Sequence, residues 1–226
     1  MKRVELVQKE RYTFDDLCRI MELLRSENGC PWDREQTHES IRKNFIEEVY
    51  EVCEAIDGKD AEGMVEELGD VMMQVVFHAL IGQENGEFEM SDVFDGVCKK
   101  LIVRHPHVFG ELTLESGTSE EVLSNWENIK NSTKKNATVL SPIQQVPKCF
   151  PALMRIQKIA KRAQKAGVET PCDDVRAALA AFEQNADMSR AGELLAAVSE
   201  LLRKNGVDAE EALELYANDY TRRILE

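Results

Sequence analysis

The chain has 226 residues, of which 31% are charged and only 6% aromatic, a composition typical of amphipathic helices, and we predict an all-α fold. Its 42 acidic and 28 basic residues leave a net charge of −14, which disfavours binding to nucleic acid and to anionic membranes. No apolar run approaches the roughly 20 residues that span a bilayer and no signal peptide is apparent, so we expect a cytoplasmic protein.

Apolar residues recur at helical spacing along most of the chain and define the predicted elements in order. In the first element, Leu17, Met21 and Leu24 lie on one face, and Thr13 is placed to cap the N-terminus. The predicted helices of the first part of the chain cover residues 14–25, 39–56, 61–84, 90–103 and 119–130. The second and third are separated only by the turn DGKD, so we expect them to form an antiparallel hairpin.

Residues 131–151 are polar, contain prolines and show no helical period. We predict a linker here, between a module at residues 14–130 and a second module at residues 152–226. The second module resembles the first, because LCRIMELLR matches LMRIQKIAK and GDVMMQVVFHAL matches GELLAAVSELL. The chain is therefore predicted to be a tandem of helical modules, of which the second is a smaller and diverged copy.

The stretches EEVYE (47–51) and EELGD (66–70) concentrate carboxylates on two otherwise apolar helices. On the first of these helices, Glu48 lies at the edge of the apolar stripe and Glu51 follows it on the same face. On the second helix the polar residues share one narrow stripe, made of Glu67, Asp70, Gln74 and His78. Apolar residues cover the rest of that helix, so we expect it to be buried.

If the hairpin packs these two edges together, four carboxylates converge and repel one another unless a cation compensates them. They are Glu48, Glu51, Glu67 and Asp70. A set of oxygen ligands suits Mg²⁺ or Mn²⁺ better than zinc. One alternative is that each motif only decorates a solvated helix face. Another is a ferritin-like di-iron bundle using Glu35 and His38, but that bundle needs two Glu-x-x-His motifs and the second is absent.

Five segments in the order CPWDREQTHESI, EEVYE, EELGDVMMQVVFHA, KKLIVRHPHVFG and NWENIK resemble the MazG family of nucleoside triphosphate pyrophosphohydrolases. The resemblance covers most of residues 14–130, and the acidic motifs match the family's E-E-x-x-E, spacer, E-x-x-D pattern without departure. Many family members carry two tandem modules, which agrees with the internal repeat. The resemblance implies an all-helical, magnesium-dependent enzyme that assembles as a homodimer.

By this resemblance, the chain would hydrolyse a nucleoside triphosphate to the monophosphate and diphosphate. The metal ligands for Mg²⁺, with Mn²⁺ as an alternative, would be Glu48, Glu51, Glu67 and Asp70. Glu47 would orient or deprotonate the attacking water. Cleavage between the α- and β-phosphates requires charge neutralisation and an activated water, and a carboxylate-bound metal supplies both.

The resemblance also assigns the side chains that would bind the substrate. Lys100 and Arg104, four residues apart, occupy the positions of the family's phosphate-binding pair, although cations are also common at solvated helix ends. Trp126 and Lys130 have the same spacing, and a tryptophan there can contact the nucleotide. Trp32, with Asp33 beside it in CPWD, is a further candidate for the nucleotide pocket.

The second module has lost the acidic pattern. Aligning Gly69 with Gly192 puts Glu193 at the place of Asp70, and the other three members of the polar stripe are replaced. Arg190 stands for Glu67, Ala197 for Gln74 and Leu201 for His78. One register places Ala177, Ala178 and Ala181 where the first module has its E-E-x-x-E glutamates. We therefore predict that this module binds no catalytic metal and serves packing, dimer assembly or regulation.

Two functions from different classes follow from these patterns. The first is a Mg²⁺-dependent nucleoside triphosphate pyrophosphohydrolase with one working site per chain, completed at a dimer interface. The alternative is a helical regulatory protein that senses nucleotides without turnover. The complete set of acids in the first module favours turnover, while base and sugar preference leave no signature in residue spacing.

Overall fold

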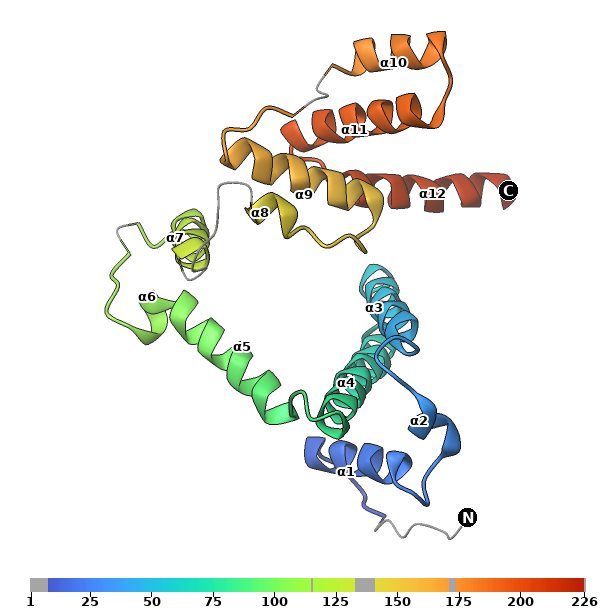
Figure 1. The fold of residues 1–226 in the computed structure, drawn as a ribbon, viewed down its shortest axis with the longest axis vertical. Helices are drawn as coiled ribbons and strands as arrows, with labels where there is room; N and C mark the ends of the chain where they lie inside the picture. The colour runs from blue at the N-terminus through green and yellow to red at the C-terminus, as the bar shows by residue number, and fades with distance from the viewer. Residues whose placement is uncertain (1–7, 115, 133–140, 171–173, 226) are drawn as a thin grey trace. The chain divides into compact units, whose positions relative to one another are not determined.

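The computed structural model describes residues 8–114, 116–132, 141–170 and 174–225. Those residues form twelve helices and no strand, which confirms the predicted all-α fold (Figure 1). The chain divides into two compact units, residues 1–130 and 131–226.

The helices of the first unit are α1 (Phe14–Arg25), α2 (Pro31–Glu35), α3 (Arg42–Asp57), α4 (Ala61–Glu84), α5 (Met90–Arg104), α6 (Pro106–Phe109) and α7 (Ser119–Ser132), the last ending just past the boundary. Those of the second unit are α8 (Ser141–Gln144), α9 (Ala152–Lys165), α10 (Val175–Gln184), α11 (Met188–Lys204) and α12 (Ala209–Leu225). In the described part of the chain, no helix is long and apolar enough to cross a membrane.

α1 begins at the N-cap that the sequence predicts. The side chain of Thr13 accepts a hydrogen bond from the backbone N–H of Asp16, and the Asp16 carboxylate accepts one from the backbone N–H of Thr13 at 2.8 Å. This reciprocal pair satisfies two N–H groups that the first helical turn would otherwise leave without partners.

α3 and α4 form the predicted hairpin and pack along each other (Figure 1). Lys59 in the connecting turn has a positive φ of 53°, and the Asp60 side chain caps α4 by accepting from two backbone N–H groups of its first turn. α4 has the predicted bounds. α3 begins at Arg42 instead of residue 39, because Thr37 and Ser40 hydrogen-bond each other in a turn before it.

The core of the first unit lies where α1 and the start of α3 cover the second half of α4. It is formed by the buried side chains of Met21, Ile41, Val76, Phe77 and Ile81. The expectation that α4 is buried all round is wrong for its first half, where Val65 is 73% exposed and Leu68 50%. The reason is that α1 packs against the second half only, so nothing in the described first unit covers those residues.

Arg25 fastens α2 and its flanking loops to the rest of the unit. Its guanidinium pairs with Glu84 at 2.5 Å and lies 5.3 Å from the centre of the Phe77 ring. It also donates to the backbone carbonyls of Asp33 and Gln36. This nearly buried side chain therefore ties the CPWDREQ segment to α4 through charge-assisted hydrogen bonds.

α5 leaves the end of α4 at an open angle instead of folding back along it (Figure 1). All of its residues up to Val103 except Met90 are exposed. The exposed apolar side chains of this helix are Val93, Phe94, Val97, Leu101, Ile102 and Val103. Such a face is larger than a solitary soluble helix normally leaves in water.

The second unit repeats the packing order of the first. α9 packs on α11 as α1 packs on α4, and α10 forms a hairpin with α11 as α3 does with α4. α12 packs on both α9 and α11, whereas α5 packs on α4 and α6. The buried side chain of Gln157 joins these helices by donating to the carbonyls of Ser199 and Val207 and accepting from the N–H of Ala209. The segment 131–151, expected to be a linker, contains the short helix α8, which contacts α9, while residues 133–140 lie outside the described part.

Candidate functional site

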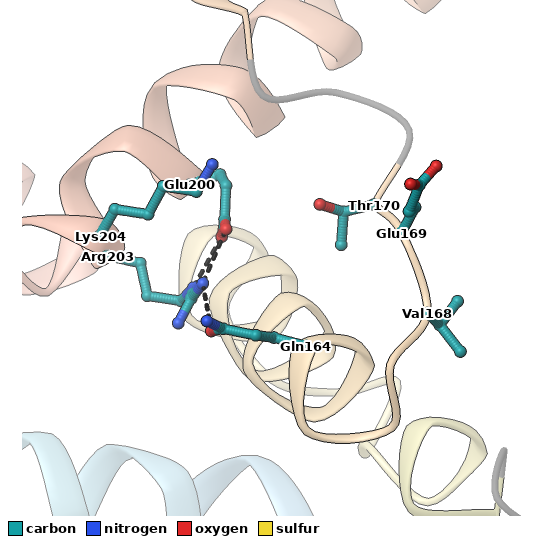
Figure 2. Close-up of a pocket in the computed structure, with 7 residues that line it drawn as sticks. All are labelled: Gln164, Val168, Glu169, Thr170, Glu200, Arg203 and Lys204. Atoms are coloured by element: carbon teal, nitrogen blue, oxygen red, sulfur yellow. Dashed lines mark hydrogen bonds and ion pairs between the residues drawn. The ribbon is translucent and has the colours of Figure 1, made fainter.

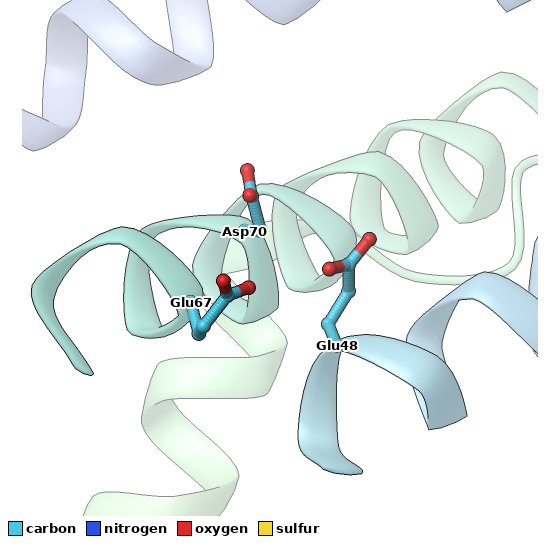
Figure 3. Close-up of side chains that lie close together, drawn as sticks. All are labelled: Glu48, Glu67 and Asp70. Carbon is cyan, nitrogen blue, oxygen red and sulfur yellow. The ribbon is translucent and has the colours of Figure 1, made fainter. Parts of the chain in front are cut away.

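Three of the four acidic side chains that the sequence predicts to converge on the α3–α4 hairpin do so. Glu48 comes from α3, and Glu67 and Asp70 lie one turn apart on α4 (Figure 3). One carboxylate oxygen from each of the three lies within 4.8 Å of the others. Among the described residues, no other group of three histidine, cysteine or acidic side chains comes as close together.

The pKa values of Glu48 and Glu67 are both raised, by partial burial and by the charges of neighbouring carboxylates. Burial raises the pKa of Glu48, and the charges of Asp70 and Glu51 raise it further, while a hydrogen bond with the Gln74 side chain opposes the rise. Partial burial also raises the pKa of Glu67, followed by the charge of Glu51 and a hydrogen bond shared with it. When ionised, these carboxylates repel one another, and a bound cation would compensate their charge.

The donor set suits a hard divalent cation. All three ligand atoms are carboxylate oxygens, and none is a nitrogen or sulfur, which fits Mg²⁺ or Mn²⁺ and argues against zinc. Glu51, the fourth predicted ligand, is not one of the three converging groups but lies close enough to Glu67 to share a hydrogen bond.

Glu47 lies at the outer edge of the same turn of α3. It forms an ion pair with Lys43 at 3.0 Å, and its side chain is 49% exposed. Its charge contributes to the raised pKa of Glu48. Glu47 is thus open to solvent beside the three converging carboxylates.

The predicted substrate-binding side chains lie elsewhere in the first unit. Arg104, at the end of α5, lies over the ring of Trp126 from α7, with 5.0 Å between the guanidinium carbon and the ring centre. Lys100 is exposed one turn earlier on α5. The side chain of Lys130 lies outside the described part of the chain.

These cations are far from the acids along the helices. Glu67 is 17 residues before the end of α4, about 25 Å of helix, and Arg104 is at the opposite end of α5 from the junction, about 20 Å away. α5 contacts α4 but not α3 among the described residues. Within one chain, the acidic group and the Arg104–Trp126 pair are therefore separated from each other.

Trp32 and Asp33 lie on α2. Trp32 is 57% exposed, and its backbone carbonyl accepts a hydrogen bond from the Gln36 side chain. The Asp33 carbonyl is held by Arg25. The indole is therefore offered to solvent from a segment whose backbone is fixed.

Two contacts at this hairpin were not predicted. His38 and His78 stack with their Nδ1 atoms 2.8 Å apart, and Gln74 reaches Glu48. The sequence predicted that Gln74 and His78 share one face of α4. It did not predict that Gln74 contacts Glu48 or that His78 contacts His38, because these contacts depend on how α3 and the loop before it pack on α4.

The corresponding face of the second unit carries an ion pair in place of the acidic group. Arg190 and Glu193 pair at 2.7 Å, at the positions aligned with Glu67 and Asp70. Ala197, aligned with Gln74, is completely buried. Within the residues described, no group of converging carboxylates is found on this helix.

The second unit also contains a cavity of about 420 Å³ between α9, α11 and the segment after α9 (Figure 2). Two of its charged groups are paired: Arg203 donates two hydrogen bonds of 2.7 Å to the buried carboxylate of Glu200, and it donates one to Gln164 at 2.9 Å. The hydrogen bond from Arg203 to Gln164 links α11 to α9.

Comparison with known proteins relates the whole chain to one enzyme family. The profile of the MazG nucleotide pyrophosphohydrolase domain matches residues 36–109, which include the α3–α4 hairpin. The nucleoside triphosphate pyrophosphohydrolase of Escherichia coli K12 is 39% identical over 94% of this chain and 86% of its own length. A Thermotoga maritima protein named nucleoside triphosphate pyrophosphohydrolase/pyrophosphatase MazG is 39% identical over 93% and 84%.

A third relative is longer. The uncharacterized protein YabN of Bacillus subtilis is 44% identical over 71% of this chain, and the match spans only 32% of YabN. The similarity to the two pyrophosphohydrolases, in contrast, extends through both units.

Proposed function

The chain belongs to the MazG nucleotide pyrophosphohydrolase family, and on that premise we propose that it hydrolyses nucleoside triphosphates to the monophosphate and diphosphate. The observation that carries the proposal is the convergence of Glu48, Glu67 and Asp70 within 4.8 Å on a partly buried helix hairpin. Three carboxylates kept this close destabilise the fold unless they bind a cation, so their presence favours turnover over the alternative of a non-catalytic nucleotide sensor.

Glu48, Glu67 and Asp70 would hold Mg²⁺, with Mn²⁺ as the alternative, and Glu51 would complete the set from beside Glu67. The metal would neutralise charge on the phosphate oxygens and make a bound water more acidic. The hairpin holds the carboxylates on two packed helices, so little reorganisation is needed when the cation and substrate bind.

Glu47 is proposed to take the proton of the attacking water. It is exposed on the same turn of α3 as Glu48, and its ion pair with Lys43 is a surface contact that a substrate can displace. In the reaction, the water oxygen bonds to phosphorus, the link between the α- and β-phosphates breaks, and diphosphate leaves with the electron pair. The water proton passes to Glu47.

Lys100, Arg104 and Lys130 would neutralise the phosphates, and Trp126 or Trp32 would contact the nucleotide. Arg104 is already oriented by the Trp126 ring. Because the phosphates carry the negative charge of the substrate and the chain has a net charge of −14, local cations are required to draw a polyanion to the site.

We infer that the cations meet the acids in a homodimer. α5 carries its cations away from the acidic group of its own chain, and α4 leaves Val65, Leu68 and Met72 exposed near that group. An apolar helix such as α5 from a second copy is complementary to this surface. A sedimentation experiment tests this: a dimer is expected, and a monomer that hydrolyses triphosphates would contradict it.

The cytoplasm is the proposed location. The cysteines of the described residues are free thiols, in keeping with a reducing compartment, and intracellular nucleotides are the proposed substrate class.

The proposed function is tested by measuring the products formed from a panel of ribo- and deoxyribonucleoside triphosphates with Mg²⁺. Monophosphate and diphosphate in equal amounts are expected, and EDTA should stop their formation. Binding of a nucleotide without any product would instead support the sensor.

A further inference from the structure

Gln74 is a buried polar side chain next to the acidic group. It lies on α4 one turn after Asp70, is only 5% exposed and hydrogen-bonds Glu48 across the hairpin. Buried side-chain amides are normally satisfied at both their nitrogen and their oxygen. Gln157 in the second unit is an example, since each end of its amide has a backbone partner.

The amide of Gln74 is satisfied at one end only. An ionised carboxylate can only accept hydrogen bonds, so the Nε2 atom of Gln74 must donate to Glu48. The Oε1 atom is then left buried without a hydrogen-bond partner. Because both atoms belong to one amide, this acceptor lies within a few ångströms of the Glu48 carboxylate.

The second unit shows that the fold does not require an amide here. Ala197 occupies the aligned position on α11 and is completely buried. A helix hairpin with the same packing order therefore forms without the glutamine. The first unit keeps a polar group that is only partly satisfied, and it keeps it beside the three carboxylates.

We propose that Gln74 is a positioning residue of the metal site: its Nε2 orients the Glu48 carboxylate toward Glu67 and Asp70, and its Oε1 accepts a hydrogen bond from a water bound to the divalent cation. This rests on the proposed function, in which the three carboxylates hold the metal. Side chains that orient metal ligands commonly change metal affinity by 10-fold or more when they are replaced.

The test replaces Gln74 with methionine, which keeps the length and apolar stem and removes the amide. Mn²⁺ binding to the full-length protein is measured without nucleotide by electron paramagnetic resonance. We expect the affinity of Gln74→Met for Mn²⁺ to fall roughly 10-fold. The Mg²⁺ concentration for half-maximal diphosphate release should rise by the same factor, while the rate at saturating Mg²⁺ falls less.

Stability of the metal-free protein separates positioning from packing. Both tryptophans lie in the first unit, so their fluorescence during urea unfolding reports that unit. Gln74→Met should unfold at the same or a higher urea concentration than the natural chain, because it removes an unsatisfied buried acceptor. The matched control Gln157→Met removes a satisfied amide, so calorimetry should show lower stability of the second unit with unchanged Mn²⁺ binding.

Unchanged Mn²⁺ affinity in Gln74→Met, in a natural chain that binds Mn²⁺ and releases diphosphate, would overturn the role of Gln74 and leave the proposed function standing. A natural chain that neither binds Mn²⁺ nor releases diphosphate would overturn both.

Discussion

The α3–α4 and α10–α11 hairpins are each packed against a preceding helix, but they differ in the charged residues that they carry. In the first, Glu48, Glu67 and Asp70 converge, and in the second the aligned pair Arg190 and Glu193 neutralises itself. Both hairpins pack against a preceding amphipathic helix. The helical scaffold therefore does not need the acids, and we infer that the first unit keeps them, despite their mutual repulsion, to bind a cation.

The largest expected effect on activity comes from a substitution that copies the Arg190–Glu193 ion pair of the second unit into the first unit. In Glu67→Arg, the new cation can pair with Asp70 as Arg190 pairs with Glu193. Diphosphate release should fall by more than about 100-fold, because charge neutralisation by the metal contributes several kcal/mol. The urea concentration that unfolds the metal-free first unit, followed by tryptophan fluorescence, should not decrease.

The reverse exchange, Arg190→Glu, is its control. It should cost at most about 1 kcal/mol, from the lost helix pair and the new repulsion with Glu193, and leave diphosphate release unchanged. A Glu67→Arg variant that retains activity would mean that the acidic group is not the metal site.

Metal should stabilise one unit and not the other. With free Mg²⁺ at 100 times its dissociation constant, the free energy of unfolding of the first unit should increase by about 2.7 kcal/mol. Urea unfolding followed by tryptophan fluorescence, with Mg²⁺ and with EDTA, measures this. Glu48→Gln should abolish the increase, and an equal increase in that variant would place the cation elsewhere.

The substrate-binding cations should affect KM more than kcat. Arg104→Gln removes charge-assisted hydrogen bonds to phosphate and should raise KM for the triphosphate about 10-fold. Lys99→Gln is the matched control, since Lys99 lies on the same helix but pairs with Asp95 at 2.6 Å. Equal KM values in the two variants would argue against a phosphate role for Arg104.

The smallest expected effect is a pH dependence found only in the first unit. Burial and the nearby His38 lower the pKa of His78 below 6.5, so the unfolded chain binds more protons than the folded one below that pH. The stability that neutral His78 contributes is therefore present above pH 6.5 and is lost as the pH falls below it, opposite in sign to the contribution of Glu48 and Glu67, whose raised pKa values favour the folded state at lower pH. His78→Phe keeps a ring beside His38 and Phe45 and should remove the histidine contribution, so the pH dependence of unfolding should differ between this variant and the natural chain; identical pH dependences would contradict the assignment to His78.

Local signals predicted much of the first unit. The Thr13 cap, the bounds of α4 and the hairpin follow from capping residues, helical period and a short turn. The convergence of Glu48, Glu67 and Asp70 followed from their places at the edges of two neighbouring helices.

Contacts that depend on tertiary packing were beyond such reasoning. The Arg25–Glu84 ion pair, the His38–His78 contact and the Gln74–Glu48 hydrogen bond join segments far apart in the sequence. The burial of α4 was overestimated because an apolar pattern predicts that a surface is covered without identifying the helix that covers it.

The most direct test of the account compares diphosphate release by Glu48→Gln and Glu193→Gln, one acid from each unit, with that of the natural chain at saturating Mg²⁺. We expect Glu48→Gln to lose more than about 100-fold in activity and Glu193→Gln to keep the activity of the natural chain. Full activity in Glu48→Gln, or its loss in Glu193→Gln, would contradict the assignment of catalysis to the first unit.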